Sequence, residues 1–93
     1  MSRLSRKYPG KTDAEIFGKV DEAMARVAER HSLHYQADGA ALTGKVSKMG
    51  ATGAYAVRDG EVTVDLKYPL LVPGALRQRI EADIERRLDR LFA

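Results

Sequence analysis

The sequence predicts an α+β fold: an antiparallel meander of four to five strands packed with two amphipathic helices, in the order β-α-β-β-β-β-α. Near both ends of the chain, apolar residues recur every three to four positions, whereas in the middle they alternate with polar residues. Asp-Gly pairs at 38–39 and 59–60 interrupt the alternating region, as hairpin turns do. With 93 residues, 44% hydrophobic and 31% charged, the chain is expected to form a single domain, residues 1–93.

The first helix is predicted at residues 12–31. Thr12 and Glu15 have the spacing of a capping box, in which Thr12 accepts from a backbone N–H and Glu15 reaches back to the Thr12 N–H. The apolar stripe that follows consists of Ile16, Phe17, Val20, Ala23, Met24, Val27, Ala28 and His31. Because polar residues fill the other side, this helix should pack on one face only.

Four strands are predicted after the first helix, near residues 33–36, 42–46, 53–57 and 62–67. Asp38-Gly39 and Asp59-Gly60 are the expected hairpin turns, and the second pair is the clearer signal. In the last strand Val62, Val64 and Leu66 alternate with polar residues. This alternation predicts a sheet that is covered on one face and exposed to solvent on the other.

Prolines end the sheet, at Pro69 and Pro73, because proline cannot donate to a strand ladder. A second helix is predicted at 74–92, with a narrow apolar stripe of Leu76, Ile80, Ile84, Leu88 and Leu91. The narrow stripe places this helix on the surface of the sheet. Residues 2–8 leave two alternatives open, a short leading strand or a flexible arm.

The net charge of +3 belongs to the N-terminal segment. Residues 1–11 contain no acid and four basic residues: Arg3, Arg6, Lys7 and Lys11. Of the 16 basic residues in the chain, 12 therefore remain for residues 12–93, against 13 acidic residues. A nucleic-acid partner would have to use this basic segment, and the nearly neutral body makes nucleic acid the weaker alternative.

Several classes of protein are excluded by what the chain lacks. It has no cysteine, which excludes disulfide frameworks, thiolate metal sites and cysteine nucleophiles. No apolar run approaches the ~18 residues of a membrane-spanning helix. The basic N-terminus also lacks the apolar region of a secretory signal, so we expect a cytoplasmic protein.

The C-terminal third carries a family resemblance. Its residues are Leu66-Lys67-Tyr68-Pro69-Leu70-Leu71, then Leu76-Arg77-Gln78-Arg79-Ile80-Glu81, and finally Ile84 with Leu88-Asp89-Arg90-Leu91. This pattern resembles the polyhydroxyalkanoic acid system family, small bacterial proteins associated with polyhydroxyalkanoate granules. The resemblance implies a granule-associated role, a leading strand at residues 2–8 and no catalytic residues to carry over.

The residues themselves offer little for catalysis. His31 and His34 lie three apart, without the third ligand and rigid geometry that a metal site needs. Glu81, Glu85 and Asp89 would form a solvated helix face, and Asp83 would pair with Arg86 or Arg87. The glycines at 44, 50 and 53 are expected to permit a bend, a bulge or a close helix approach. We therefore predict no catalytic residues, no cofactor and no metal.

The most unusual stretch connects the last strand to the second helix, with Tyr68, Leu70, Leu71 and Val72 as the candidate interaction residues. Loops normally face water, so an apolar connection needs an explanation. Either it closes the core beneath the helix, the more economical interpretation, or it presents its side chains to a partner.

These observations favour a non-enzymatic protein of the polyhydroxyalkanoate system, whose partner would be the granule surface or a granule protein. One alternative is a small module that binds an apolar ligand, which requires a pocket of roughly 300 Å³ between sheet and helices. The other is nucleic-acid binding through the basic segment. A homodimer would be an easy way for so small a chain to bury more surface.

Overall fold

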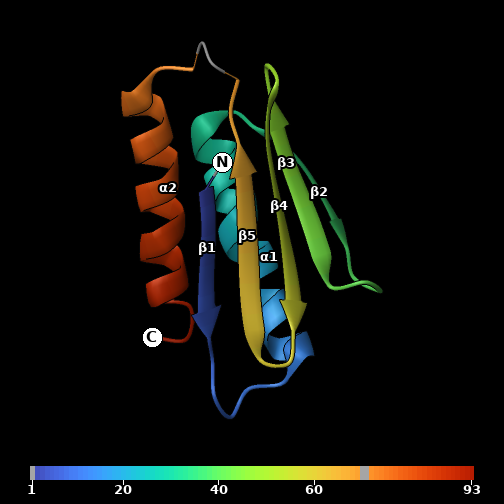
Figure 1. The fold of residues 1–93 in the computed structure, drawn as a ribbon. Helices are drawn as coiled ribbons and strands as arrows, with labels where there is room; N and C mark the ends of the chain where they lie inside the picture. The colour runs from blue at the N-terminus through green and yellow to red at the C-terminus, as the bar shows by residue number, and fades with distance from the viewer. Residues whose placement is uncertain (1, 70–71) are drawn as a thin grey trace.

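The computed structural model describes residues 2–69 and 72–93, and it contains a five-stranded antiparallel sheet with two helices on one face (Figure 1). The helices are α1 (Asp13–His31) and α2 (Gly74–Asp89). The strands are β1 (Ser2–Lys7), β2 (His34–Asp38), β3 (Thr43–Lys48), β4 (Ala51–Arg58) and β5 (Glu61–Lys67). The predicted α+β class and element order are thus confirmed.

The leading segment is a strand, as the resemblance implied. In the sheet order β1-β5-β4-β3-β2, strand β1 lies at one edge and pairs antiparallel with β5. Arg3 stands opposite Asp65, and Lys7 stands opposite Glu61. The backbone N–H of Tyr8 also donates to the Gly60 carbonyl at 2.9 Å. The alternative of a flexible arm is therefore wrong.

The core lies between α1, α2 and the inner face of the sheet. Helix α1 begins at the predicted cap, where the Thr12 hydroxyl accepts from the Glu15 backbone N–H at 3.1 Å. The Glu15 carboxylate accepts from that same hydroxyl at 3.2 Å, and not from the backbone as predicted. The residues that fill the core are Ile16, Val20, Met24, Val27, Ala28, Val46, Tyr55, Val57, Val62, Val64, Leu66, Ile80, Ile84 and Leu88.

The turns agree with the prediction at one hairpin and differ at another. Asp59 and Gly60 both have positive φ, 53° and 77°, which fits a tight two-residue turn. Asp38-Gly39 is not such a turn, because residues 39–42 form a longer loop. Here the Asp38 carboxylate accepts from the N–H groups of Ala40 and Ala41.

Two element boundaries and the roles of two glycines differ from expectation. Helix α2 ends at Asp89 instead of 92, and β4 begins at Ala51 instead of 53. Gly44 and Gly53 lie in strands that pair in continuous register, so neither forms a bulge, and both leave room for neighbouring side chains. A Cβ on Gly44 would overlap the Tyr55 ring, and one on Gly53 would lie 2.7 Å from a Leu66 methyl.

Candidate interaction surface at one end of the sheet

The β3–β4 turn and the start of α2 lie at the same end of the molecule (Figure 1), and each carries an exposed apolar side chain. Met49 is 90% exposed and Leu76 is 40% exposed, and these are the exposed large hydrophobic residues within 2–69 and 72–93. Met49 is held out by the turn itself, in which Met49 and Gly50 have φ of 49° and 89°.

The connection between β5 and α2 lies between these two residues. Pro69 is exposed and Val72 is half-buried, and the Val72 N–H donates to the Pro69 carbonyl at 3.1 Å. A Cβ on Gly50 would lie 3.6 Å from Pro69 Cγ, so the hairpin turn and the connection are neighbours. We call Met49, Pro69, Val72 and Leu76 the apolar end; the predicted interaction residues Leu70 and Leu71 lie outside the described residues.

Tyr68 fixes this connection to the core. Its half-buried ring packs against the core cluster, with the Arg77 guanidinium 5.6 Å from the ring centroid. Burial, with a smaller contribution from nearby Glu81, raises the pKa of Tyr68 to about 12. Its hydroxyl is buried without a well-formed hydrogen bond to any described residue. Tyr68 is therefore placed to position the apolar end more than to contact a partner.

The space beneath the apolar end is small. A hollow lined by Leu33, Leu66, Tyr68 and Ile80, among others, has a volume of about 20 Å³. Ligand pockets generally measure about 300 Å³ or more. A larger open hollow of about 490 Å³ also reaches Leu76, but it lies between α1 and α2, where Arg30, His31 and Asp83 are among its lining residues. No space of ligand size therefore opens between the sheet and the helices at the apolar end of the described structure.

The basic N-terminal segment does not form one continuous patch. Arg3 forms an ion pair with Asp65 at 2.7 Å on the outer face of the sheet. Arg6 points to the helix side and pairs with Asp89 at 2.7 Å. Lys11 lies 4.8 Å from the centroid of the Phe92 ring, and Lys7 is exposed. Three of the four predicted basic residues thus make contacts within the fold.

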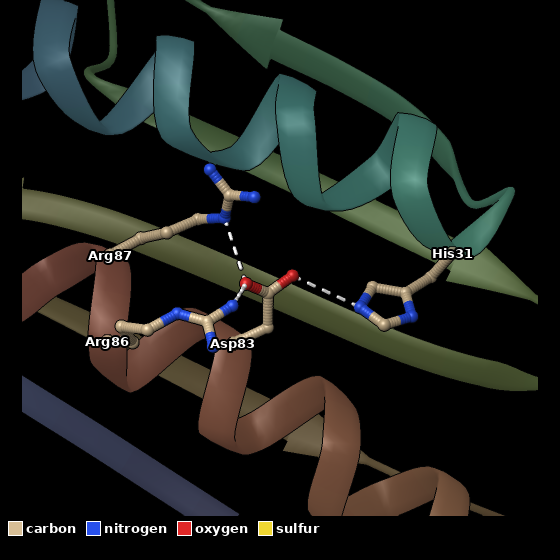
Figure 2. A network of polar contacts seen from close by, with 4 residues as sticks. All are labelled: His31, Asp83, Arg86 and Arg87. Carbon is tan, nitrogen blue, oxygen red and sulfur yellow. Dashed lines mark hydrogen bonds and ion pairs between the residues drawn. The ribbon is translucent and has the colours of Figure 1, made fainter.

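A polar network joins the end of α1 to the middle of α2 (Figure 2). Asp83 is buried, with its side chain 4% exposed, and one of its oxygens lies 3.1 Å from His31 Nε2. The other oxygen accepts from Arg86 Nη2 at 2.7 Å and from Arg87 Nε at 3.0 Å. The predicted pairing of Asp83 with these arginines is confirmed, whereas its burial and its contact with His31 were not predicted.

Both oxygens of Asp83 are thus engaged by groups that donate hydrogen bonds. Burial alone would raise the pKa of this carboxyl, but the hydrogen bond with His31, the charge of Arg87 and the hydrogen bonds from Arg86 and Arg87 outweigh it and lower the pKa. Within residues 2–69 and 72–93, no group of three or more His, Cys, Asp or Glu side chains could hold a metal ion. His34 lies apart from His31, exposed on the outer face of β2.

The family of the chain is assigned from its sequence. Residues 10–92 match the model of a family described as "Putative polyhydroxyalkanoic acid system protein". The chain belongs to this family. Comparison with curated proteins gave no match. The match spans α1 to the end of α2, so it includes the whole apolar end of this polyhydroxyalkanoic acid system protein.

Within the two described stretches, neither helix combines the length and the apolar character needed to span a bilayer.

A second polar network was not predicted from the sequence. The Tyr35 hydroxyl donates to the Asp21 carboxylate at 2.6 Å and lies 2.7 Å from the Tyr55 hydroxyl, which can donate to it. Burial, followed by the hydrogen bonds with Asp21 and Tyr55, raises the pKa of Tyr35 well above its ordinary value, and burial also raises the pKa of Tyr55. Because these side chains lie on α1, β2 and β4, only the packing brings them together.

The burial of Asp83 did leave a signal in the sequence. Asp83 lies three residues after Ile80 and one before Ile84, so it falls on the apolar stripe of the helix. A carboxylate on the apolar stripe of a helix predicts that its partner also faces the core. Met49 left no comparable signal, because a methionine rarely occupies a turn position with positive φ.

Proposed function

We propose that this polyhydroxyalkanoic acid system protein is a non-enzymatic protein that binds the granule surface through its apolar end. The observation that carries the proposal is the position of Met49 and Leu76, which flank the apolar connection between β5 and α2. Complete burial of an exposed large apolar side chain contributes roughly 1.5–3 kcal/mol, so Met49 can contribute most of this range and Leu76, which is 40% exposed, a smaller part. The two residues together would contribute enough for a weak, reversible contact with an apolar polyester.

Charged residues around the apolar end would hold the protein in one orientation on such a surface. Arg77 and Arg79 lie on the first turns of α2, next to Leu76, and both are exposed. On the other side Lys48 precedes Met49, and its ammonium group donates to the His31 carbonyl at 3.0 Å. These cations would remain in water at the rim while the apolar side chains contact the polyester.

The two other functions have less support. A ligand-binding module needs a pocket between sheet and helices, and the hollow there measures about 20 Å³. Nucleic-acid binding needs free cations, but Arg3 and Arg6 are paired with Asp65 and Asp89. A granule protein in place of the polyester itself remains the alternative partner for the same apolar end.

Fractionation of granule-forming cells tests the proposal. The tagged protein, expressed at native level, is expected to sediment with the granules. The double variant Met49→Asp/Leu76→Asp should move to the supernatant, because carboxylates at these positions would lose their hydration on an apolar surface. Both positions are exposed, so circular dichroism and the melting temperature should stay close to those of the parent protein.

A matched control adds the same charge at the opposite end of the molecule. Ala14, at the start of α1, and Ala41, in the β2–β3 loop, are both exposed. The variant Ala14→Asp/Ala41→Asp should remain with the granules. A parent protein found entirely in the supernatant would contradict the proposal, as would equal sedimentation of both double variants.

A further inference from the structure

The sheet ends in two edge strands that differ in how they are protected. Unpaired edges invite pairing with another chain, and proteins block them with lysine, arginine or proline. Strand β1 carries Arg3, Arg6 and Lys7, and Pro9 follows it. Strand β2, with the sequence His-Tyr-Gln-Ala-Asp, has no Lys, Arg or Pro. The edge at β2 is therefore the one left open.

We propose that β2 pairs with β2 of a second copy of this chain, antiparallel about a two-fold axis at Gln36. The two sheets would then form one continuous sheet with both outer faces on the same side. In this register Gln36 stands opposite Gln36 of the second copy, and Tyr35 stands opposite Ala37 of the second copy. All five residues of the strand are then paired.

The polar side chains of β2 are self-complementary in this register. His34, Gln36 and Asp38 face the same outer side of the sheet, because alternate residues of a strand share a face. His34 of each copy meets Asp38 of the other copy, so an imidazole faces a carboxylate twice. One Asp38 oxygen accepts from the loop N–H groups of Ala40 and Ala41, which leaves the other oxygen for this contact.

Neighbouring groups on the outer face do not oppose this pairing. The residues on β3 opposite His34, Gln36 and Asp38 are Ser47, Lys45 and Thr43. Lys45 adds a positive charge one strand away from the carboxylates of the interface. Self-pairing of β1 would instead bring Arg3, Arg6 and Lys7 of two copies together, with repulsion between like charges.

Cysteine scanning tests the geometry directly, because the chain has no cysteine of its own. Gln36→Cys would place two thiols across the two-fold axis, within about 4.5–5.5 Å between Cβ atoms. Mild oxidation should convert this variant to a covalent dimer of twice 10.3 kDa. Lys45→Cys, one strand inward, and Ser5→Cys, on the β1 edge, should remain monomers on denaturing gels.

Charge variants test the register in solution by light scattering and sedimentation. His34→Lys places a cation opposite Asp38 and should retain the dimer, whereas His34→Glu should weaken dimerisation about tenfold. A parent protein that stays at 10.3 kDa up to concentrations of several hundred micromolar would overturn the proposal. Equal cross-linking of Ser5→Cys and Gln36→Cys would overturn it too, as would equal dimerisation of the two His34 variants.

Discussion

Asp83 is the buried charged residue within the described part of the chain, and its surroundings explain how the core tolerates it. A buried carboxylate is costly unless donors replace its hydration. His31 supplies one donor from α1, while Arg86 and Arg87 supply two from the next turn of α2. The network therefore joins the two helices at a point where apolar packing would otherwise be interrupted.

Truncation of Asp83 should reveal this role. Asp83→Ala removes the acceptor for three donors and leaves the mostly buried His31 side chain without its partner, which should cost about 1–3 kcal/mol in the free energy of unfolding. Asp83→Leu should cost less, because an apolar side chain of similar size fills the space. Urea denaturation of the two variants at pH 7 measures both values, and a smaller loss for alanine than for leucine would contradict this explanation.

The same carboxyl should make stability depend on acid pH. Its pKa is lowered in the folded protein from the ordinary value of 3.8. The stabilisation is therefore fully present above about pH 4 and is lost as the pH falls through the lower folded value. The difference in unfolding free energy between the parent and Asp83→Asn should narrow below pH 4. A constant difference from pH 7 to pH 2 would show that ionisation of Asp83 does not matter.

Gly44 is a second residue whose identity follows from its neighbour. It stands directly opposite Tyr55 in the β3–β4 pair, and a Cβ there would meet the tyrosine ring. Gly44→Ala should cost about 1–3 kcal/mol, the range for overpacking a core. In a Tyr55→Leu background the same change should cost less, because the ring is gone. Thermal unfolding of the parent, the two single variants and the double variant gives the coupling free energy between Gly44→Ala and Tyr55→Leu.

At the scale of elements, strand β1 is joined to the end of α2 by side chains as well as by the sheet. The Tyr8 hydroxyl donates to the Leu88 carbonyl at 2.7 Å, and the Tyr8 ring lies 5.4 Å from that of Phe92. Arg6 adds its ion pair with Asp89. The first strand and the last turn of the last helix thus stabilise each other.

Removing the Tyr8 hydroxyl should weaken this junction. Tyr8→Phe keeps the ring and loses one hydrogen bond, at a cost of about 1 kcal/mol. Burial raises the pKa of Tyr8 to about 12, so its stabilisation is fully present below pH 10 and is lost as the pH rises through 12. The parent and the variant should therefore converge between pH 10 and pH 12 in urea titrations, whereas a difference independent of pH would contradict the assignment.

The elements were predictable where a single physical signal determines them. The Thr12 cap and the apolar spacing define α1, and Asp59-Gly60 defines the β4–β5 turn. The β2–β3 loop could not be predicted from the Asp38-Gly39 pair. The Asp38 carboxylate accepts from two loop N–H groups, and these hydrogen bonds belong to a loop longer than a tight two-residue turn. The Met49-Gly50 turn was missed because Met49 adopts a backbone conformation that its side chain does not favour.

The candidate site was predictable only in part. The apolar connection after Lys67 is visible in the sequence, and so are the arginines that partner Asp83. The proximity of Met49 to that connection is not visible, because it depends on β3 and β4 lying next to β5 in the sheet. The contacts of Asp83 with His31, and of Tyr35 with Asp21, likewise arise only when α1 packs on the sheet.

At the scale of the whole molecule, the fold separates two kinds of surface. The molecule measures 40 × 23 × 21 Å, and the apolar end lies at one end of the strands (Figure 1). The outer face of the sheet is polar and carries the Arg3–Asp65 ion pair. One apolar end offers a small contact, so a single copy should bind an apolar surface weakly. In the proposed dimer, antiparallel pairing of β2 would place two apolar ends at opposite ends of the joined sheet.

The most direct test of the central claim is the depletion of purified protein from solution by particles of polyhydroxyalkanoate polyester, free of granule proteins. The parent protein and Ala14→Asp/Ala41→Asp are expected to adsorb equally, whereas Met49→Asp/Leu76→Asp should require at least tenfold more polyester for the same depletion. Equal adsorption of all three proteins, or no adsorption of the parent, would contradict the claim that the apolar end binds the polyester.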